Sequence, residues 1–242
     1  MGELHRSLSK DRSLSDAIHK AKQQGLVPLL ADIKPQSPRE GDLVKQKDPV
    51  QLARSLAGAG ACALSVVTEP RHFGGSLQML RDVAQAVSLP VLRKDFISSV
   101  EQVEESREAG AAAVLLILAT TPERLVSMLY RRIQGLGMEA VVEIHSRREL
   151  DLALALSPTM IGINNRDILR LEKDKGDVAL TEELAPLVPK PILTISESSL
   201  NTDDDIRRAL QAGADAVLVG TAILQSDDPI ARVRDLVFCM KG

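Results

Sequence analysis

Aromatic side chains are scarce in this sequence, which has no tryptophan, one tyrosine and three phenylalanines among 242 residues. Proteins that bind single-stranded nucleic acid stack bases on aromatic side chains, so this composition argues against such a surface. The net charge of -3 and the pI near 5.9 argue against binding to nucleic acid or to a membrane surface. Leucine, valine, isoleucine and alanine must therefore fill the core.

Cysteine, histidine and long apolar runs are also scarce. Cys62 and Cys239 lie far apart and in no metal-ligating spacing, so we expect two reduced, buried thiols. His72 and His145 have no second ligand at metal-like spacing, and we expect no metal site. No run approaches the roughly 18 apolar residues of a membrane span, and residues 1–24 lack the apolar segment of a signal peptide. A cytoplasmic protein without membrane or nucleic-acid partners is expected.

What the chain does contain is a regular alternation of short apolar runs with segments whose apolar residues recur at helical spacing. The runs predict strands, and the segments between them predict amphipathic helices. The predicted strands are 27–34, 63–69, 90–96, 113–119, 139–146, 160–167, 191–198 and 216–224, and the predicted helices are 13–24, 49–59, 76–87, 99–109, 121–136, 147–156, 180–187, 202–212 and 228–240.

Helix start and stop signals support this division. Thr121 and Asp228 each precede a proline, which is typical of a capping residue before the first turn, and Gly110 and Gly213 stand where helices should end. Strict alternation predicts a parallel sheet, and eight units close naturally into a barrel. The glycine-rich dinucleotide fingerprint is missing after the first strand. We therefore predict an α/β chain forming a single (β/α)8-barrel catalytic domain over residues 1–242, with a short extra N-terminal helix.

Polar residues gather at the predicted carboxyl ends of the strands, where such barrels carry their active sites. Two lysines and two or three carboxylates facing one cavity would make an acid–base set, because neighbouring charges tune each pKa. For any single residue, the alternative is a structural salt bridge at the barrel rim. The candidates are Asp32, Lys34, Ser37, Glu69, Lys94, Asp95, Glu143, Asn164, Asn165, Arg166, Glu197 and Ser198, whereas the fourth strand offers only Leu115 and Ile117.

The last two predicted strands carry a candidate phosphate site, in the strings Thr194–Ser198 and Val219–Ala222. Barrels often hold phosphate with the loops after strands seven and eight, using backbone N–H groups at a helix N-terminus. Gly220 would let the backbone approach an oxyanion closely. The alternative is a tight turn with small residues for packing. Their positions on consecutive strands favour a phosphorylated small molecule as the ligand.

Several of these strings resemble indole-3-glycerol phosphate synthase. The resemblance runs from about Leu14 to the C-terminus, in order and with the spacing of that family, and its two most specific parts are Lys94-Asp95-Phe96 and the string 162–167. The strings are 31–34 (ADIK) with Ser37-Pro38, 64–69 (LSVVTE), 92–96 (LRKDF), 142–144 (VEI), 162–167 (GINNRD), 196–198 (SES) and 219–221 (VGT).

The resemblance implies a substrate, 1-(2-carboxyphenylamino)-1-deoxyribulose 5-phosphate, which is converted without a cofactor to indole-3-glycerol phosphate, CO2 and water. It implies that Lys94 is the general acid at the ketone, that Glu143 is the general base of the dehydration, and that Lys34 contacts substrate and phosphate. The further residues implied are Asp32, Asn164 and Glu197 in the catalytic centre, Ser37 and Arg166 beside the substrate, Ser198, Ser199, Gly220 and Thr221 at the phosphate, and Phe96 and Leu115 around the aromatic ring.

The sequence departs from the family pattern at Asp32, where a glutamate is usual, and at Ser199, where a glycine is usual. The segment before the first strand, which in the family helps to cover the substrate, is short. Two alternatives stay open: another sugar-phosphate barrel enzyme, such as a phosphoribosyl isomerase, and a catalytically silent barrel that binds a phosphorylated ligand. We expect a monomer or a weak homo-oligomer.

Overall fold

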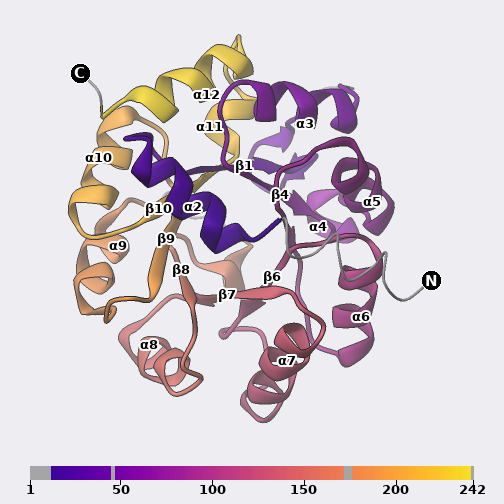
Figure 1. The fold of residues 1–242 in the computed structure, drawn as a ribbon, viewed down its shortest axis with the longest axis vertical. Coiled ribbons are helices and arrows are strands. Elements are labelled where there is room, and N and C mark those ends of the chain that lie inside the picture. The colour runs from indigo at the N-terminus through magenta and orange to yellow at the C-terminus, as the bar shows by residue number, and fades with distance from the viewer. Residues whose placement is uncertain (1–11, 45–46, 172–175, 241–242) are drawn as a thin grey trace.

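A computed structural model describes residues 12–44, 47–171 and 176–240. Eight parallel strands form a closed barrel with the order β1-β10-β9-β8-β7-β6-β5-β4, surrounded by helices (Figure 1). The predicted (β/α)8 barrel and the extra N-terminal helix are thus confirmed.

The eight barrel strands lie within the predicted runs, and each is shorter than its run. The barrel strands are β1 (Leu29–Ile33), β4 (Ala63–Val67), β5 (Val91–Lys94), β6 (Ala113–Ile117), β7 (Glu139–Ile144), β8 (Met160–Asn164), β9 (Leu193–Glu197) and β10 (Ala216–Val219). The longer helices are α2 (Leu14–Gln23), α3 (Pro49–Gly58), α5 (Leu77–Ala86), α6 (Val100–Glu108), α7 (Glu123–Gly135), α8 (Arg147–Leu154), α10 (Asp203–Gln211) and α12 (Pro229–Phe238). The shorter elements are the pair β2 (Gln36–Ser37) and β3 (Gly41–Asp42), α4 (Pro70–Phe73), η1 (Ile168–Arg170), α9 (Ala179–Leu184), η2 (Ala185–Leu187) and α11 (Thr221–Leu224).

Burial on both faces explains why the strands read as unbroken apolar runs. One cluster, which includes Leu30, Leu92 and Leu115, fills the inside of the barrel. The other cluster packs the outer face of the strands against the helices, through residues such as Val66 and Leu80. Parallel strands covered on both sides need apolar residues at every position, so the period-two alternation of a half-exposed sheet is missing.

Most of the predicted helix signals are confirmed, and two expectations are wrong. Asp228 accepts hydrogen bonds from the first-turn N–H groups of α12, and Gly110 and Gly213 adopt left-handed φ values of 88° and 112°. Thr121 does not cap α7: the N-cap position is Pro122, without a side-chain cap, and the Thr121 hydroxyl donates to the carbonyl of Ile97 at 3.3 Å. The last predicted strand does not extend to 224, because the chain turns into the short helix α11 after Gly220.

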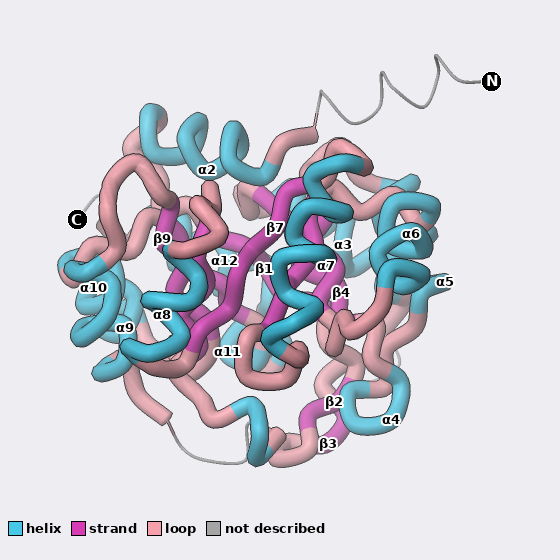
Figure 2. The backbone as a smooth tube through the Cα atoms, turned by 90° about the horizontal axis from the view of Figure 1, so that it is seen from below, coloured by secondary structure: helices cyan, strands magenta, loops and turns pink. Residues whose placement is uncertain are grey.

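The N-terminal helix closes the end of the barrel at which the strands begin. Leu14 and Ile18 of α2 pack into the inner barrel cluster. The carboxylate of Glu139, the first residue of β7, accepts hydrogen bonds from the backbone of Leu14 and the hydroxyl of Ser15. Figure 2 shows α2 at one end of the molecule and the β2–β3 pair with α4 at the other. Helix α2 therefore does not cover the carboxyl ends of the strands.

Both cysteines are free, as expected, but they are only partly buried rather than fully so. Loss of solvation raises the pKa of the Cys62 thiol to about 12. No helix among the described residues has both the length and the apolar character needed to cross a membrane.

Candidate active site

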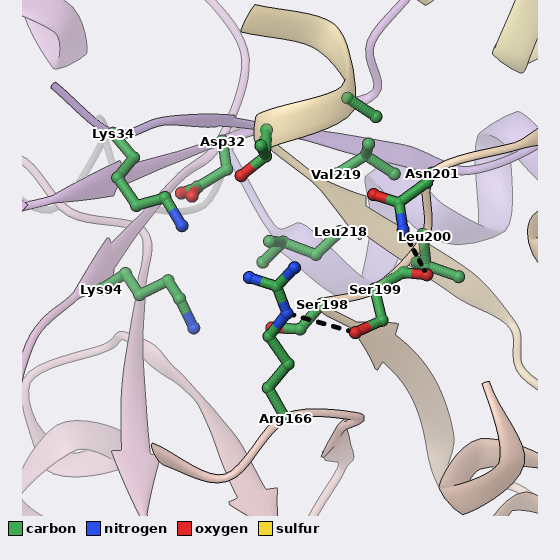
Figure 3. Close-up of a pocket in the computed structure, with 13 residues that line it drawn as sticks. Asp32, Lys34, Lys94, Arg166, Ser198, Ser199, Leu200, Asn201, Leu218 and Val219 are labelled. Carbon is green, nitrogen blue, oxygen red and sulfur yellow. Dashed lines mark hydrogen bonds between the residues drawn. The ribbon is translucent and has the colours of Figure 1, made fainter. Parts of the chain in front are cut away.

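A cavity with about 420 Å³ of empty space opens at the carboxyl ends of the strands. Figure 3 shows the side chains of Lys34, Lys94 and Arg166 directed into it from three different strand ends, with the carboxylate of Asp32 beside them. Three cations around one small cavity favour an anionic ligand. The loops after β9 and β10 complete the wall with Ser198, Ser199, Leu200, Asn201, Gly220, Thr221 and Ala222, above Leu218 and Val219.

A second, more apolar cavity with about 330 Å³ of empty space lies on the other side of the two lysines. The rings of Phe73 and Phe96 stand 6.5 Å apart, and the Lys34 Nζ atom lies 5.7 Å from the centroid of the Phe73 ring. Lys34 and Lys94 line both cavities, so they stand between a polar compartment and an apolar one. The remaining lining residues are Val67, Glu69, Asp95, Ile117 and Ile168.

Two buried carboxylates hold the ammonium group of Lys94. Its Nζ atom lies 3.1 Å from Glu197 Oε2 and 3.3 Å from Glu143 Oε2, and both glutamates are fully buried. Burial raises the pKa of Glu197 to about 7; the charge of Lys94 opposes this rise, and the charge of Glu143 adds to it. Because the pKa of Glu197 is near 7, this lysine and its two glutamates form a set that can donate and accept protons near neutral pH.

His145 connects Glu143 to the start of α8. Its Nε2 atom lies 3.3 Å from Glu143 Oε1, and its Nδ1 atom lies 3.4 Å from Glu149 Oε2. Neither imidazole nitrogen has a hydrogen-bond partner among the described residues, so both contacts are electrostatic. Burial alone would lower the pKa of His145, but the two glutamates outweigh it and raise that pKa.

Asp32 is buried at the end of β1, where Ser65 of β4 donates a hydrogen bond of 2.6 Å to its Oδ1 atom. Gly220 lies so close that a Cβ atom there would stand 3.0 Å from both Cβ and Oδ2 of Asp32. Gly162 has a similar relation to Glu197, since a Cβ atom there would overlap Glu197 Oε1. Glycine at both positions makes room for a carboxylate.

Three buried polar atoms of residues at the carboxyl ends of the strands have no hydrogen-bond partner among the described residues: Glu143 Oε1, Asn164 Nδ2 and Glu197 Oε1. Native proteins leave few such atoms unsatisfied, and those that remain call for an explanation. A ligand with several hydroxyl groups would supply partners for them.

Other candidates have structural partners. Glu69 caps α4 by accepting from the backbone N–H groups of Arg71, His72 and Phe73. Asp95 pairs with the buried Arg93 at 3.0 Å. Asn165 donates to the backbone carbonyls of Glu197 and Ser198.

Two predicted substrate contacts lie apart from the cavities. Ser37 is buried in β2 and accepts from the backbone of Arg39 at 3.3 Å. Leu115 is buried inside the barrel, and Ile117, two residues nearer the mouth, lines the apolar cavity instead.

The sequence reasoning missed Phe73, Ile168 and Asn201, which line the two cavities. Phe73 and Ile168 lie in helices of only four and three residues, which carry no detectable periodicity. In the sequence His145 stands out only as a possible metal ligand, although its spacing of four residues from Glu149 is a visible signal of a side-chain pair.

A closed (β/α)8 barrel whose strand ends hold a lysine between two buried carboxylates is the framework of an acid–base enzyme. The sequence model of the family described as indole-3-glycerol phosphate synthase matches residues 2–236. The chain belongs to this family.

Comparison with individual proteins supports the same family assignment. The indole-3-glycerol phosphate synthase of Thermococcus kodakarensis is 46% identical over 93% of this chain and 96% of its own length. The indole-3-glycerol phosphate synthase of Pyrococcus furiosus is 44% identical over 93% of this chain and 96% of its own length. The indole-3-glycerol phosphate synthase of Kineococcus radiotolerans is 42% identical over 90% of this chain and 78% of its own length. A solved structure of a designed cube-shaped protein cage has a TM-score of 0.62 at 15% identity, covering 89% of this chain and 72% of that one, and shows the fold alone.

The function expected from the sequence is thereby confirmed. The chain has the activity of an indole-3-glycerol phosphate synthase, a carboxy-lyase of tryptophan biosynthesis.

Proposed function

We propose that the cavities flanking Lys34 and Lys94 bind 1-(2-carboxyphenylamino)-1-deoxyribulose 5-phosphate and close its indole ring, with Lys94 as general acid and Glu143 as general base. The observation that carries this proposal is the position of Lys94. Its side chain lines both cavities, and its Nζ atom is within 3.3 Å of two buried carboxylates. A proton donor is needed at the junction between the aromatic and the sugar-phosphate halves of the substrate, because the new bond joins those halves.

The shapes and charges of the two cavities support one orientation of the substrate. The phosphate belongs in the cationic cavity, beside Arg166, Lys34 and the backbone of Ser198, Ser199, Gly220 and Thr221. The anthranilate ring belongs in the apolar cavity, beside the rings of Phe73 and Phe96 that line it. Between them, the sugar hydroxyls would satisfy Asn164 Nδ2 and Glu197 Oε1.

The reaction then follows from proton transfers at this junction. The ring carbon that carries the carboxylate attacks the ketone carbon, and the developing alkoxide takes a proton from the Lys94 ammonium. Loss of CO2 restores the aromatic ring. Glu143 next removes a proton from the five-membered ring while the new hydroxyl leaves as water, taking a proton from a lysine ammonium. Lys34, over the Phe73 ring, keeps a second cation at the same junction.

Indole fluorescence on mixing protein with 1-(2-carboxyphenylamino)-1-deoxyribulose 5-phosphate tests the proposal, and the absence of tryptophan keeps the background low. Growing indole emission that disappears in the Lys94→Ala variant supports it. Substrate binding without emission from the wild-type protein would point to a barrel that has lost catalysis, and no binding would contradict the proposed site.

We further propose that the chain acts as one catalytic domain over residues 1–242, as a monomer or weak homo-oligomer in the cytoplasm. The single closed barrel and the free thiols of Cys62 and Cys239 support this proposal. Light scattering coupled to size exclusion over a range of protein concentrations measures the oligomeric state; a stable oligomer at the lowest concentration would contradict it.

A further inference from the structure

Ser199 adopts a backbone conformation that favours glycine. Its φ is 57°, and Ser198 before it has a φ of 64°, so two consecutive serines lie in the left-handed region. Residues with a Cβ atom are disfavoured there, and such strain is usually kept where the surrounding structure uses the side chain. The side chain of Ser199 is therefore expected to have a function of its own.

The hydroxyl of Ser199 holds Arg166. The Nε atom of Arg166 donates to Ser199 Oγ at 3.2 Å, and both residues are buried (Figure 3). Gly176 lies directly against this contact, since a Cβ atom there would overlap Ser199 Oγ. A contact at Nε fixes the plane of a guanidinium, because the group is rigid and planar.

We infer that Ser199 is a positioning residue, which orients the Arg166 guanidinium toward the phosphate of the substrate. This inference rests on the proposed phosphate site and deepens it. Arg166 and Ser199 line the cationic cavity together, and in Figure 3 the end of the Arg166 side chain lies in the middle of that cavity. The hydroxyl thus offsets the strain of the left-handed backbone by pre-orienting a cation for an oxyanion.

Inorganic phosphate is the probe, because it reports on the cationic cavity without chemistry. Its dissociation constant is measured by calorimetric titration for the wild-type protein and the Ser199→Ala and Ser199→Gly variants. We expect both variants to bind phosphate about tenfold more weakly, the loss typical of one hydrogen bond to a charged group. In turnover, KM should rise by a similar factor while kcat changes little, since the contact acts on binding.

The glycine variant separates positioning from strain. Ser199→Gly relieves the left-handed backbone and should melt at a higher temperature than Ser199→Ala, although both lose phosphate affinity. Ser157 is a matched control, because it is exposed, has a φ of 52° and is not among the residues lining the cationic cavity. Ser157→Gly should change the melting temperature without changing phosphate binding.

A double-mutant cycle shows whether Ser199 acts through Arg166. In an Arg166→Ala background, Ser199→Ala should have no further effect on the phosphate dissociation constant. Unchanged phosphate affinity in the Ser199→Ala and Ser199→Gly variants would overturn the inference and leave the proposed site standing. The same conclusion would follow if Ser199→Ala lowered the phosphate affinity equally in the wild-type and the Arg166→Ala backgrounds. Failure of the wild-type protein to bind phosphate would overturn the proposed phosphate site itself.

Discussion

Lys94 Nζ lies 3.1 Å from Glu197 Oε2, a carboxylate with no exposed surface. The proton affinity of a buried glutamate depends on the charge of a lysine beside it, so the titration of Glu197 is linked to the state of Lys94. The pair forms one acid–base unit at the centre of the barrel mouth.

Replacing Lys94 with alanine should lower kcat by about 10²–10⁴-fold, the usual contribution of a positioned general acid. Substrate binding should largely survive, because Arg166 and Lys34 still line the cationic cavity. Indole emission measures the rate, and calorimetric titration the affinity. The matched control is Lys20→Ala, in an exposed position on α2. Near-normal turnover by the Lys94→Ala protein would refute its role.

Glu197 should make stability depend on pH in a direction opposite to that of a carboxylate whose pKa is lowered in the folded protein. Its pKa is raised from 4.5 to about 7, so its protonated form favours the folded state below pH 4.5, and this contribution is lost as the pH rises to about 7. Relative to Glu197→Gln, the wild-type melting temperature should therefore fall across that interval and level off above it. Thermal melts of both proteins measure the difference; a difference that is constant with pH would contradict the raised pKa.

The barrel was predictable from the sequence because its determinants are local and repeated. Strands buried on both faces read as continuous apolar runs, and the helices between them keep one apolar stripe. The run at 216–224 was misread beyond Val219, since Ala222, Ile223 and Leu224 are as apolar as a strand. They form a short helix instead, and periodicity cannot distinguish the two structures over four residues.

The site was predictable at the level of strand ends, and less so at the level of contacts. Lys94 and Asp95 are adjacent at the end of β5, yet Lys94 contacts the two buried glutamates whereas Asp95 pairs with Arg93. The sequence offers both as candidates, and only the three-dimensional contacts separate them. The left-handed backbone of Ser199 and the space that Gly176 leaves for its hydroxyl depend on loops distant in sequence.

Glu149 should control the titration of His145. The pKa of His145 is raised because Glu149 and Glu143 outweigh the loss of solvation. Glu149→Gln removes one of the two charges and should lower that pKa, so the imidazolium is lost at a lower pH. Nuclear magnetic resonance titration of the imidazole C–H signals measures it, with Glu183→Gln, an exposed change on α9, as the control. If the pKa of His145 were the same in the Glu149→Gln protein as in the wild-type protein, an effect of Glu149 on the titration of His145 would be excluded.

Glu139 should anchor α2 without influencing catalysis. Its carboxylate binds the backbone N–H of Leu14 and the hydroxyl of Ser15 at the helix start, at the end of the barrel remote from the cavities. Glu139→Ala should cost about 1–2 kcal/mol of unfolding free energy, as loss of a helix cap does. Urea unfolding measures this cost, and indole emission should show kcat unchanged. Glu108→Ala, exposed at the end of α6, should change neither quantity. A large fall in kcat for the Glu139→Ala protein with unchanged stability would mean that α2 acts on the site through the barrel rather than only closing its base.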